Sequence, residues 1–213
     1  PVKESANKEK DKAKKYILSL LKEKYGIEEE IGSLTDLNTH ITNTEANIAD
    51  AIEEFERTLI TPNARFDKWL RGDDSALTAD ELSGYELFKK YDCATCHVGP
   101  NLGGQSYELM GLRRHYFADR GLELTNEDNG RYKETQIERD RHRFKVPGLR
   151  NVEHTWPYYH DGTRETLEEA VRDMAIYQCD IEPTQAEVSD MVEFLRSLTG
   201  EYEGKPLTNA NEQ

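Results

Sequence analysis

The stretch Cys93-Ala94-Thr95-Cys96-His97 decides the fold of this chain of 213 residues. Two cysteines separated by two residues and followed at once by a histidine form the motif at which haem is attached through two thioether bonds. The histidine is then held beneath the iron as an axial ligand. The motif therefore predicts one covalent haem c, bound by Cys93, Cys96 and His97, and the surrounding elements are expected to pack around it.

Two other chemistries use a Cys-x-x-Cys pair. A zinc site needs a second pair of ligands at finger spacing, and the only other cysteine, Cys179, stands alone far downstream. A thioredoxin-like redox pair follows a strand in a βαβ pattern, which this region lacks. Haem attachment also accounts for the histidine of the motif. With the pair used for haem, Cys179 has no internal disulfide partner, and we interpret it as a small packed thiol without a special role.

Composition narrows the classes of partner. The chain has 28 basic and 42 acidic residues and a formal charge of −14, which argues against nucleic acid and favours a cationic protein partner. No apolar run approaches the length of a membrane span, and no secretory signal peptide is visible, so we interpret the sequence as a mature or trimmed chain. The length suffices for one large domain or two small ones.

Apolar periodicity predicts a mainly α fold with long loops. Helices are expected over residues 4–24 and 45–60, the second capped by Thr44, and over residues 166–177. Thr-x-x-Glu capping boxes at residues 78–81 and 184–187 start two more helices; the first runs into Cys93 and the second ends near Gly200. Residues 98–143 lack sustained periodicity, and we interpret them as a loop with short helical pieces wrapped around the haem.

The residues alone leave several candidates for the sixth iron ligand. The candidates are three methionines, Met110, Met174 and Met191, and five histidines besides His97. For a methionine on the apolar face of a helix, core filling is the ordinary interpretation, and we keep it for Met191.

Several separated motifs narrow this choice because together they resemble one family, the bacterial dihaem cytochrome c peroxidases. The similarity covers roughly residues 45–200, with its motifs in the same order. They are Ala51-Ile52-Glu53-Glu54-Phe55-Glu56-Arg57-Thr58-Leu59, Phe66-Asp67-Lys68-Trp69-Leu70-Arg71-Gly72, Asn101-Leu102-Gly103-Gly104-Gln105, Phe144-Lys145-Val146-Pro147-Gly148-Leu149-Arg150-Asn151, Thr155-Trp156-Pro157-Tyr158-Tyr159-His160-Asp161-Gly162 and Leu167-Glu168-Glu169-Ala170-Val171.

This resemblance implies a cytochrome c-like haem domain whose high-potential haem accepts electrons and has histidine and methionine ligands. The family methionine follows the histidine of the aromatic-His-Asp-Gly motif by fourteen residues, which lands on Met174 when that histidine is His160. A tyrosine replaces the methionine in the related enzyme that matures methylamine dehydrogenase, so Met174 favours the peroxidase branch. Tyr177 is a rival ligand that we interpret as core.

The resemblance also suggests residues around the haem. His160 could compete for the iron, but the family implies that it hydrogen-bonds near the haem and fixes its loop. Lys145 and Arg150 are candidates to neutralise the haem propionates, with solvated surface charge as the equal alternative. The family binds calcium partly through main-chain carbonyls of a Thr-x-Pro segment, here Thr155 and Pro157, with a further ligand from a partner domain.

The chain departs from the family in haem count. The peroxidases carry two Cys-x-x-Cys-His motifs and this sequence carries one, so we expect neither the peroxide-cleaving haem nor any catalytic residue in it. The sequence predicts a haem domain over residues 46–203, a loose tail over 204–213, and an N-terminal helical segment over 1–45, which resembles at most the closing helix of the missing domain.

Two functional hypotheses remain open. In the first, the chain is the electron-transferring haem domain of a dihaem peroxidase that reduces hydrogen peroxide to water. Its electrons would come from a small cytochrome c or cupredoxin, and its partner would be a second haem domain or a second copy. In the second, it is a self-contained monohaem electron carrier without peroxidase activity. A periplasmic location follows from the family, since this haem is attached outside the bacterial cytoplasm.

Overall fold

The computed structural model describes residues 34–208, with side chains from residue 46 onward. The helix expected over residues 4–24 lies outside this range. The chain divides into two compact units, Pro1–Ile60 and Thr61–Gln213. The domain boundary predicted between residues 45 and 46 thus falls inside the first unit.

In the first unit, helix α2 spans Leu34–Thr58. It begins well before the helix predicted over residues 45–60, so Thr44 lies inside it and is not its cap. The sequence explains the difference, because Leu37 and Ile41 continue the apolar periodicity upstream. The helix is continuous through residues 45 and 46, and the start of the haem domain at residue 46 stays a prediction.

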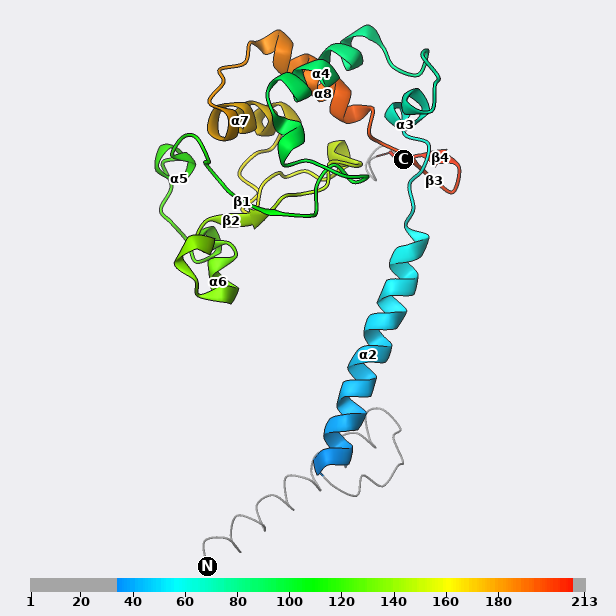
Figure 1. Ribbon diagram of the computed structural model, residues 1–213, viewed down its shortest axis with the longest axis vertical. Helices are drawn as coiled ribbons and strands as arrows, with labels where there is room; N and C mark the ends of the chain where they lie inside the picture. Colours follow the sequence, from blue (N-terminus) through cyan, green and yellow to red (C-terminus); the bar gives the residue numbers. More distant parts are fainter. Residues whose placement is uncertain (1–33, 209–213) are drawn as a thin grey trace, which may run out of the picture. The chain divides into compact units, whose positions relative to one another are not determined.

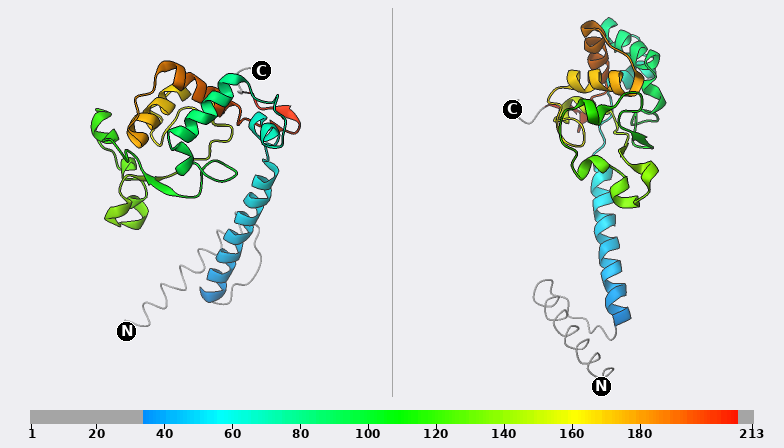
Figure 2. Two further views of the ribbon diagram at one scale, coloured as in Figure 1. Left: turned by 45° about the horizontal axis from the view of Figure 1, so that its top comes forward. Right: turned by 90° about the vertical axis from the view of Figure 1, so that its left-hand side faces the viewer.

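The second unit holds four main helices: α3 (Arg65–Leu70), α4 (Ala79–Lys90), α7 (Leu167–Cys179) and α8 (Gln185–Arg196). Helices α4 and α8 lie side by side in both Figure 1 and Figure 2, and α7 packs against α8. Gly84 allows the close approach of α4 and α8, because a Cβ atom there would lie 1.9 Å from the Asp190 carbonyl oxygen.

The apolar core of this unit centres on Phe194 of α8, which is fully buried. Three aromatic rings surround it with centroid distances of 5.3–5.4 Å, those of Phe66, Tyr85 and Phe88. Such offset and edge-on arrangements are the favourable ones for aromatic rings. Residues from α3, α4 and α8 therefore share one core, which we call the helical core.

Capping boxes start α4, α7 and α8. The two predicted boxes are confirmed, with Thr78 accepting from the Glu81 amide and Thr184 from the Glu187 amide. The box of Thr166 with Glu169 at the start of α7 was not predicted. Each box satisfies two amide groups that an α-helix leaves without an internal partner.

Between the haem motif and α7 the chain forms short elements joined by loops, as predicted for residues 98–143. They are β1 (Tyr107–Leu109), α5 (Tyr116–Asp119), α6 (Tyr132–Thr135) and β2 (Arg143–Lys145), with 3₁₀ turns η2 (Glu127–Asn129), η3 (Glu138–Asp140) and η4 (Val152–His154). Strands β1 and β2 pair antiparallel, with Glu108 opposite Phe144. This pairing was not predicted, because three-residue strands are too short to display an alternating pattern.

A small hairpin closes the described chain. Strand β3 (Glu201–Tyr202) pairs antiparallel with β4 (Lys205–Pro206), and the Leu207 amide donates to the Gly200 carbonyl over 3.3 Å. The first residues of the tail predicted from residue 204 thus take part in a hairpin. Its turn is Glu203-Gly204, whose residues both have positive φ and suit a tight hairpin.

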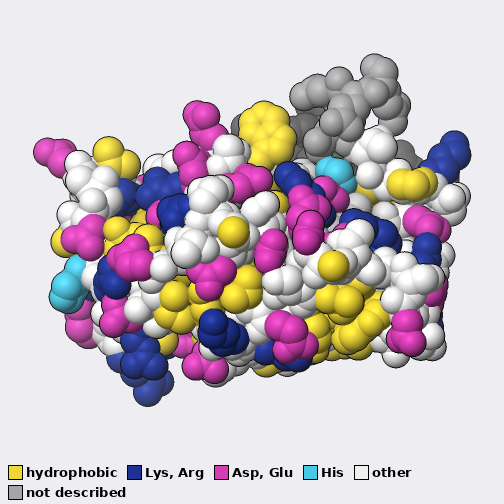
Figure 3. All heavy atoms as spheres, turned by 90° about the horizontal axis from the view of Figure 1, so that it is seen from above, with side chains coloured by type: hydrophobic (Ala, Val, Ile, Leu, Met, Phe, Trp, Pro, Cys, Tyr) yellow, Lys and Arg dark blue, Asp and Glu magenta, His cyan; other side chains and the backbone are white. Residues whose placement is uncertain are grey.

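The fold is mainly α, with few strands. Within residues 34–208, every helix is too short or too polar to cross a membrane. On the face drawn in Figure 3, acidic and basic side chains are interspersed and do not gather in one patch.

Candidate haem site

The Cys-x-x-Cys-His motif forms a tight turn at the end of α4. Its first residues make a 3₁₀ turn, η1 (Cys93–Thr95), preceded by Asp92 in the left-handed conformation with φ 60°. The amides of Cys96 and His97 both donate to the Cys93 carbonyl, over 3.3 and 3.0 Å. This turn gathers the two thiols and the imidazole on one short segment, as covalent haem attachment requires.

The His97 ring is oriented by a hydrogen bond to the backbone. Its Nδ1 lies 3.1 Å from the Leu102 carbonyl oxygen, and because a carbonyl can only accept, Nδ1 carries the proton. Nε2 is then the unprotonated nitrogen that can bind a metal. Burial lowers the pKa of His97, which keeps the imidazole neutral. The residue is thus prepared as a nitrogen ligand.

The donor set of this turn fits a c-type haem. Cys93 and Cys96 are half-buried free thiols. Burial raises the pKa of Cys96, so its thiol is protonated at neutral pH. Two thiols beside a neutral imidazole are the groups that covalent haem attachment uses.

Two of the family-like motifs, far apart in sequence, are bonded together beside this turn. The Gly104 amide donates to the Val146 carbonyl over 2.7 Å, and the Leu149 amide donates to the Asn101 carbonyl over 3.0 Å. Gly103, with φ 141°, permits this contact, because a Cβ atom there would lie 2.0 Å from the Pro147 carbonyl oxygen. The segment that orients His97 is therefore held by the segment after β2.

The two residues proposed for the haem propionates differ in their surroundings. Both terminal nitrogens of Arg150 donate to Asp67, each over 2.7 Å, and its Nε donates to the Pro100 carbonyl. The guanidinium thus joins α3 to the loop after the haem motif, and its propionate role stays a prediction. Lys145 is exposed at the end of β2.

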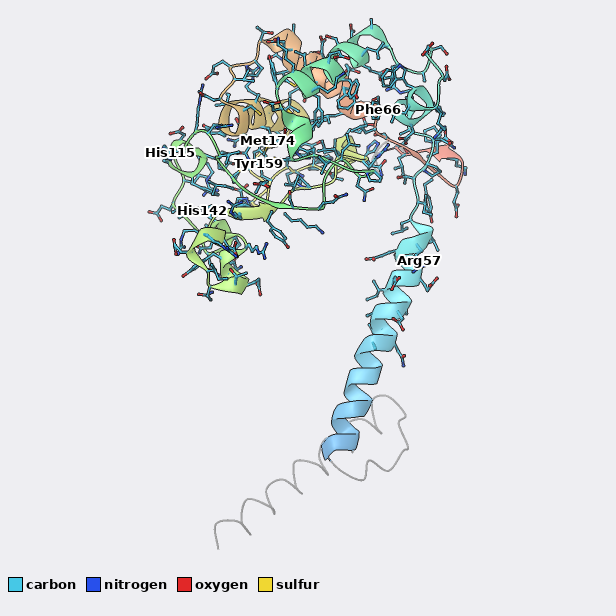
Figure 4. The ribbon with its side chains drawn as sticks, in the orientation of Figure 1. Arg57, Phe66, His115, His142, Tyr159 and Met174 are labelled. Atoms are coloured by element: carbon cyan, nitrogen blue, oxygen red, sulfur yellow. The ribbon has the colours of Figure 1, made fainter. Side chains whose placement is uncertain are left out.

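Met174 lies on α7, whose first turns are tied to the loop that carries His160. The Tyr159 hydroxyl donates to the Ala170 carbonyl over 2.9 Å, and Arg164 bonds Asp173 over 2.6 Å. Figure 4 shows Met174 and Tyr159 beside the α7 ribbon. These contacts hold the start of α7 to the loop that carries His160. The assignment of Met174 as an iron ligand stays a prediction.

The last turn of α7 is held independently of its start. The Gln178 side-chain oxygen accepts from the Gly111 and Leu112 amides, over 3.0 and 2.7 Å, and its nitrogen donates to the Leu109 carbonyl. The Arg113 amide donates to the Tyr177 carbonyl over 2.9 Å. Gln178 was not singled out from the sequence, since nothing in a polar residue near a helix end indicates such a partner.

The rival sulfur and oxygen ligands have other surroundings. Met191 is 3% exposed and packs with Tyr91 and Ala175, as a core residue does. The Tyr177 ring packs edge-on against Tyr116 at a centroid distance of 5.1 Å. Met110, between β1 and the loop that Gln178 holds, is half-buried, as is Met174.

His160 belongs to a buried charged network that sequence reasoning missed. Its Nε2 lies 2.7 Å from an Asp128 carboxylate oxygen, and its side chain is 16% exposed. Asp128 also accepts two hydrogen bonds from Arg120, over 2.8 and 2.9 Å, and Arg120 reaches Asp161 over 2.6 Å. We call residues 116–161, which contain these groups, the charged loop.

Asp128 is the centre of this network. Its side chain is 1% exposed, and the hydrogen bonds from Arg120 lower the pKa of its carboxyl well below the usual range. An ionised Asp128 can only accept, so His160 carries its proton on Nε2. Two more rings of the charged loop stack nearby, with Phe144 over His160 at 4.3 Å and Phe117 over His142 at 4.5 Å.

Two possible cation positions lie in the described residues. Asp128, His160 and Asp161 bring ligand atoms within 4.8 Å of one another, but the Arg120 guanidinium already binds both carboxylates. Thr155 and Pro157, proposed for calcium, are exposed, and the Thr155 hydroxyl donates to the Val152 carbonyl. Their main-chain carbonyls were the proposed ligands, and that assignment stays a prediction.

The mainly helical fold and the Cys-x-x-Cys-His turn define a c-type haem protein. A family model described as "Di-haem cytochrome c peroxidase" matches residues 1–75. Cytochrome c peroxidase Ccp of Escherichia coli is 54% identical over 156 residues, 73% of this chain and 33% of the relative. Cytochrome c551 peroxidase of Nitrosomonas europaea is 50% identical over 154 residues, 72% of this chain and 44% of the relative.

Two further matches have lower sequence identity to this chain. Methylamine utilization protein MauG of Methylorubrum extorquens is 32% identical over 194 residues, 85% of this chain and 49% of the relative. The crystal structure of a MauG-like protein associated with microbial copper homeostasis has a TM-score of 0.53 at 26% identity, covering 65% of this chain and 49% of that one.

The chain belongs to the di-haem cytochrome c peroxidase family. It spans between a third and a half of the length of these curated relatives.

Proposed function

We propose that this chain is the electron-transferring haem domain of a dihaem cytochrome c peroxidase. In this proposal Cys93 and Cys96 anchor one haem c in a cytochrome c-like domain, and His97 and Met174 are the axial ligands. The observation that carries it is the His97 turn, whose hydrogen bond to Leu102 leaves Nε2 as the metal-binding nitrogen. When bound, the haem supplies one-electron redox chemistry, and a thioether ligand raises its reduction potential.

The remaining roles concern the whole enzyme. The complete protein would reduce hydrogen peroxide to water in the periplasm, with electrons from a small cytochrome c or cupredoxin. A second haem domain, or a second copy of this chain, would dock where Thr155 and Pro157 offer main-chain carbonyls to calcium. The identity of 50% and more to two cytochrome c peroxidases supports this assignment.

The alternative is a monohaem electron carrier. One observation favours it, namely the single Cys-x-x-Cys-His motif in these 213 residues. The two proposals share the haem ligands and differ in whether this chain works alone.

The ligand assignment is tested by Met174→Ala in the full chain, produced with a haem-attachment system. The unaltered protein should bind one haem and show the near-infrared band of methionine bound to low-spin ferric iron, and the variant should lose that band. Met191→Leu and Met110→Ala are matched controls that should keep it. Survival of the band in Met174→Ala would refute the assignment.

A steady-state assay with peroxide and a reduced cytochrome separates the two functions. This chain alone should show no turnover if the peroxide-cleaving haem lies in another domain. Robust turnover by this chain would contradict the proposal that a second haem is required.

A further inference from the structure

The third cysteine lies against the haem-attachment turn. Cys93 and Val171 both pack against a small buried cluster of Tyr91, Ala175 and Met191. Residues at intervals of four lie on the same face of a helix, so the α7 face that carries Val171 and Ala175 continues to Cys179, the last residue of α7. This shared cluster places Cys93 near the end of α7 that carries Cys179, although the two are far apart in sequence.

The two thiols are close enough to influence each other: the pKa of Cys93 is raised, first by Cys179 and then by burial, and Cys93 lowers the pKa of Cys179. The hydrogen bond that Cys93 Sγ donates within its own turn is a long one, 4.0 Å to the Tyr91 carbonyl. The pKa of Cys96 is raised mainly by its burial, then by the Glu108 carboxylate and last by Cys179. Of the two cysteines in the motif, Cys93 is thus the one for which Cys179 is the leading influence.

Contacts that involve none of the three thiols hold Cys179 in this place. The neighbouring Gln178 is bonded to the backbone at Leu109, Gly111 and Leu112, and the Tyr177 carbonyl accepts from the Arg113 amide. The position of Cys179 next to Cys93 therefore does not depend on thioether formation.

We propose that Cys179 is a third functional thiol of the haem-attachment site, which forms a disulfide with Cys93 in the haem-free chain. Two thiols lose two protons and two electrons to an oxidant of the disulfide class, which is itself reduced to two thiols. A dithiol reductant must reverse this step before the Cys93 S–H can add across a haem vinyl group, an addition without net oxidation. The disulfide would protect Cys93 while blocking its thioether bond.

This inference rests on the haem c site proposed above. The test uses the full chain, exported with a haem-attachment system, with free thiols alkylated before purification. In the haem-free fraction, peptide mass spectrometry without reduction should find the Cys93 and Cys179 peptides joined, lighter by two hydrogens than the separate peptides. The link should persist in Cys96→Ser and disappear in Cys179→Ser.

Haem loading gives the second measurement. Oxidised glutathione added during expression should lower the haem-bound fraction of the unaltered chain more than that of Cys179→Ser or Cys179→Ala. A link found only between Cys93 and Cys96, or equal loss of haem in all three proteins, would overturn the inference. If the unaltered chain takes no haem under reducing conditions, the proposed function fails instead, so the two failures are distinguishable.

Discussion

The helical core and the charged loop of the second unit are stabilised by different physical means. Around Phe194 the contacts are apolar, and burial of this kind has no strong directional requirement. In residues 116–161 the central buried groups are Arg120 and Asp128, whose contacts depend on the position of single atoms. The fold therefore depends on filled apolar volume in the helical core and on hydrogen-bond geometry in the charged loop.

The largest effect is expected in the helical core. Phe194→Ala removes a fully buried ring that three other aromatic rings contact, and should lower the free energy of unfolding by about 4 kcal/mol. Urea denaturation followed by far-ultraviolet circular dichroism measures this loss. The neighbouring Glu193→Gln, whose side chain is 37% exposed and pairs with Arg196 in the next turn, should change this free energy by no more than about 0.5 kcal/mol. A small loss for Phe194→Ala would show that apolar volume does not dominate this region.

An intermediate effect is expected in the charged loop. Asp128→Asn keeps the shape but loses the ionised acceptor of Arg120 and His160, and should cost about 2 kcal/mol at neutral pH. Glu127→Gln is the matched control, since that side chain is 63% exposed and should contribute little. If Asp128→Asn and Glu127→Gln have the same free energy of unfolding, the charged loop does not depend on this network.

The pH dependence of stability sharpens the same contrast. The folded pKa of Asp128 is lowered, so its contribution is complete above the unfolded value of about 3.9 and is lost as pH falls from there toward the folded pKa. In acid the free energy of unfolding should therefore fall faster for the unaltered protein than for Asp128→Asn, so the difference between the two should shrink. Denaturation series at several pH values measure this difference. A difference that does not change with pH would contradict the lowered pKa.

The smallest effect is expected at Thr166, the N-cap of α7, which follows the charged loop in the chain. Thr166→Ala removes the acceptor for the Glu169 amide and should cost about 1 kcal/mol, whereas Thr166→Ser keeps an oxygen there and should be nearly neutral. Chemical denaturation of both variants provides the comparison. Equal losses would mean that the box at the start of α7 contributes through packing and not through its hydrogen bonds.

The sequence predicted the helical core far better than the charged loop. Helices α4 and α8 were predicted because apolar periodicity and a capping box both mark their starts. The Asp128 network was missed, since charged residues in an aperiodic segment look solvated. His160 lies 32 positions from Asp128, and no local pattern links the two. The motif at Cys93 was recognisable because its chemistry needs a fixed local spacing.

The ends of elements were also hard to predict. The start of α2 was placed too late because Thr44 resembles a cap, while the apolar repeat continues upstream to Leu34. The hairpin after Gly200 has only two residues in each strand, too few for a recognisable alternation.

Helix α7 is fastened near both termini, by Tyr159 and Arg164 at its start and by Gln178 at its end. A sideways shift of this helix would have to detach one of these anchors first. If Met174 binds iron as proposed, release of its sulfur is therefore linked to partial opening of the protein. Amide hydrogen exchange in α7 and the rate at which small external ligands displace the sulfur should then respond together to denaturant.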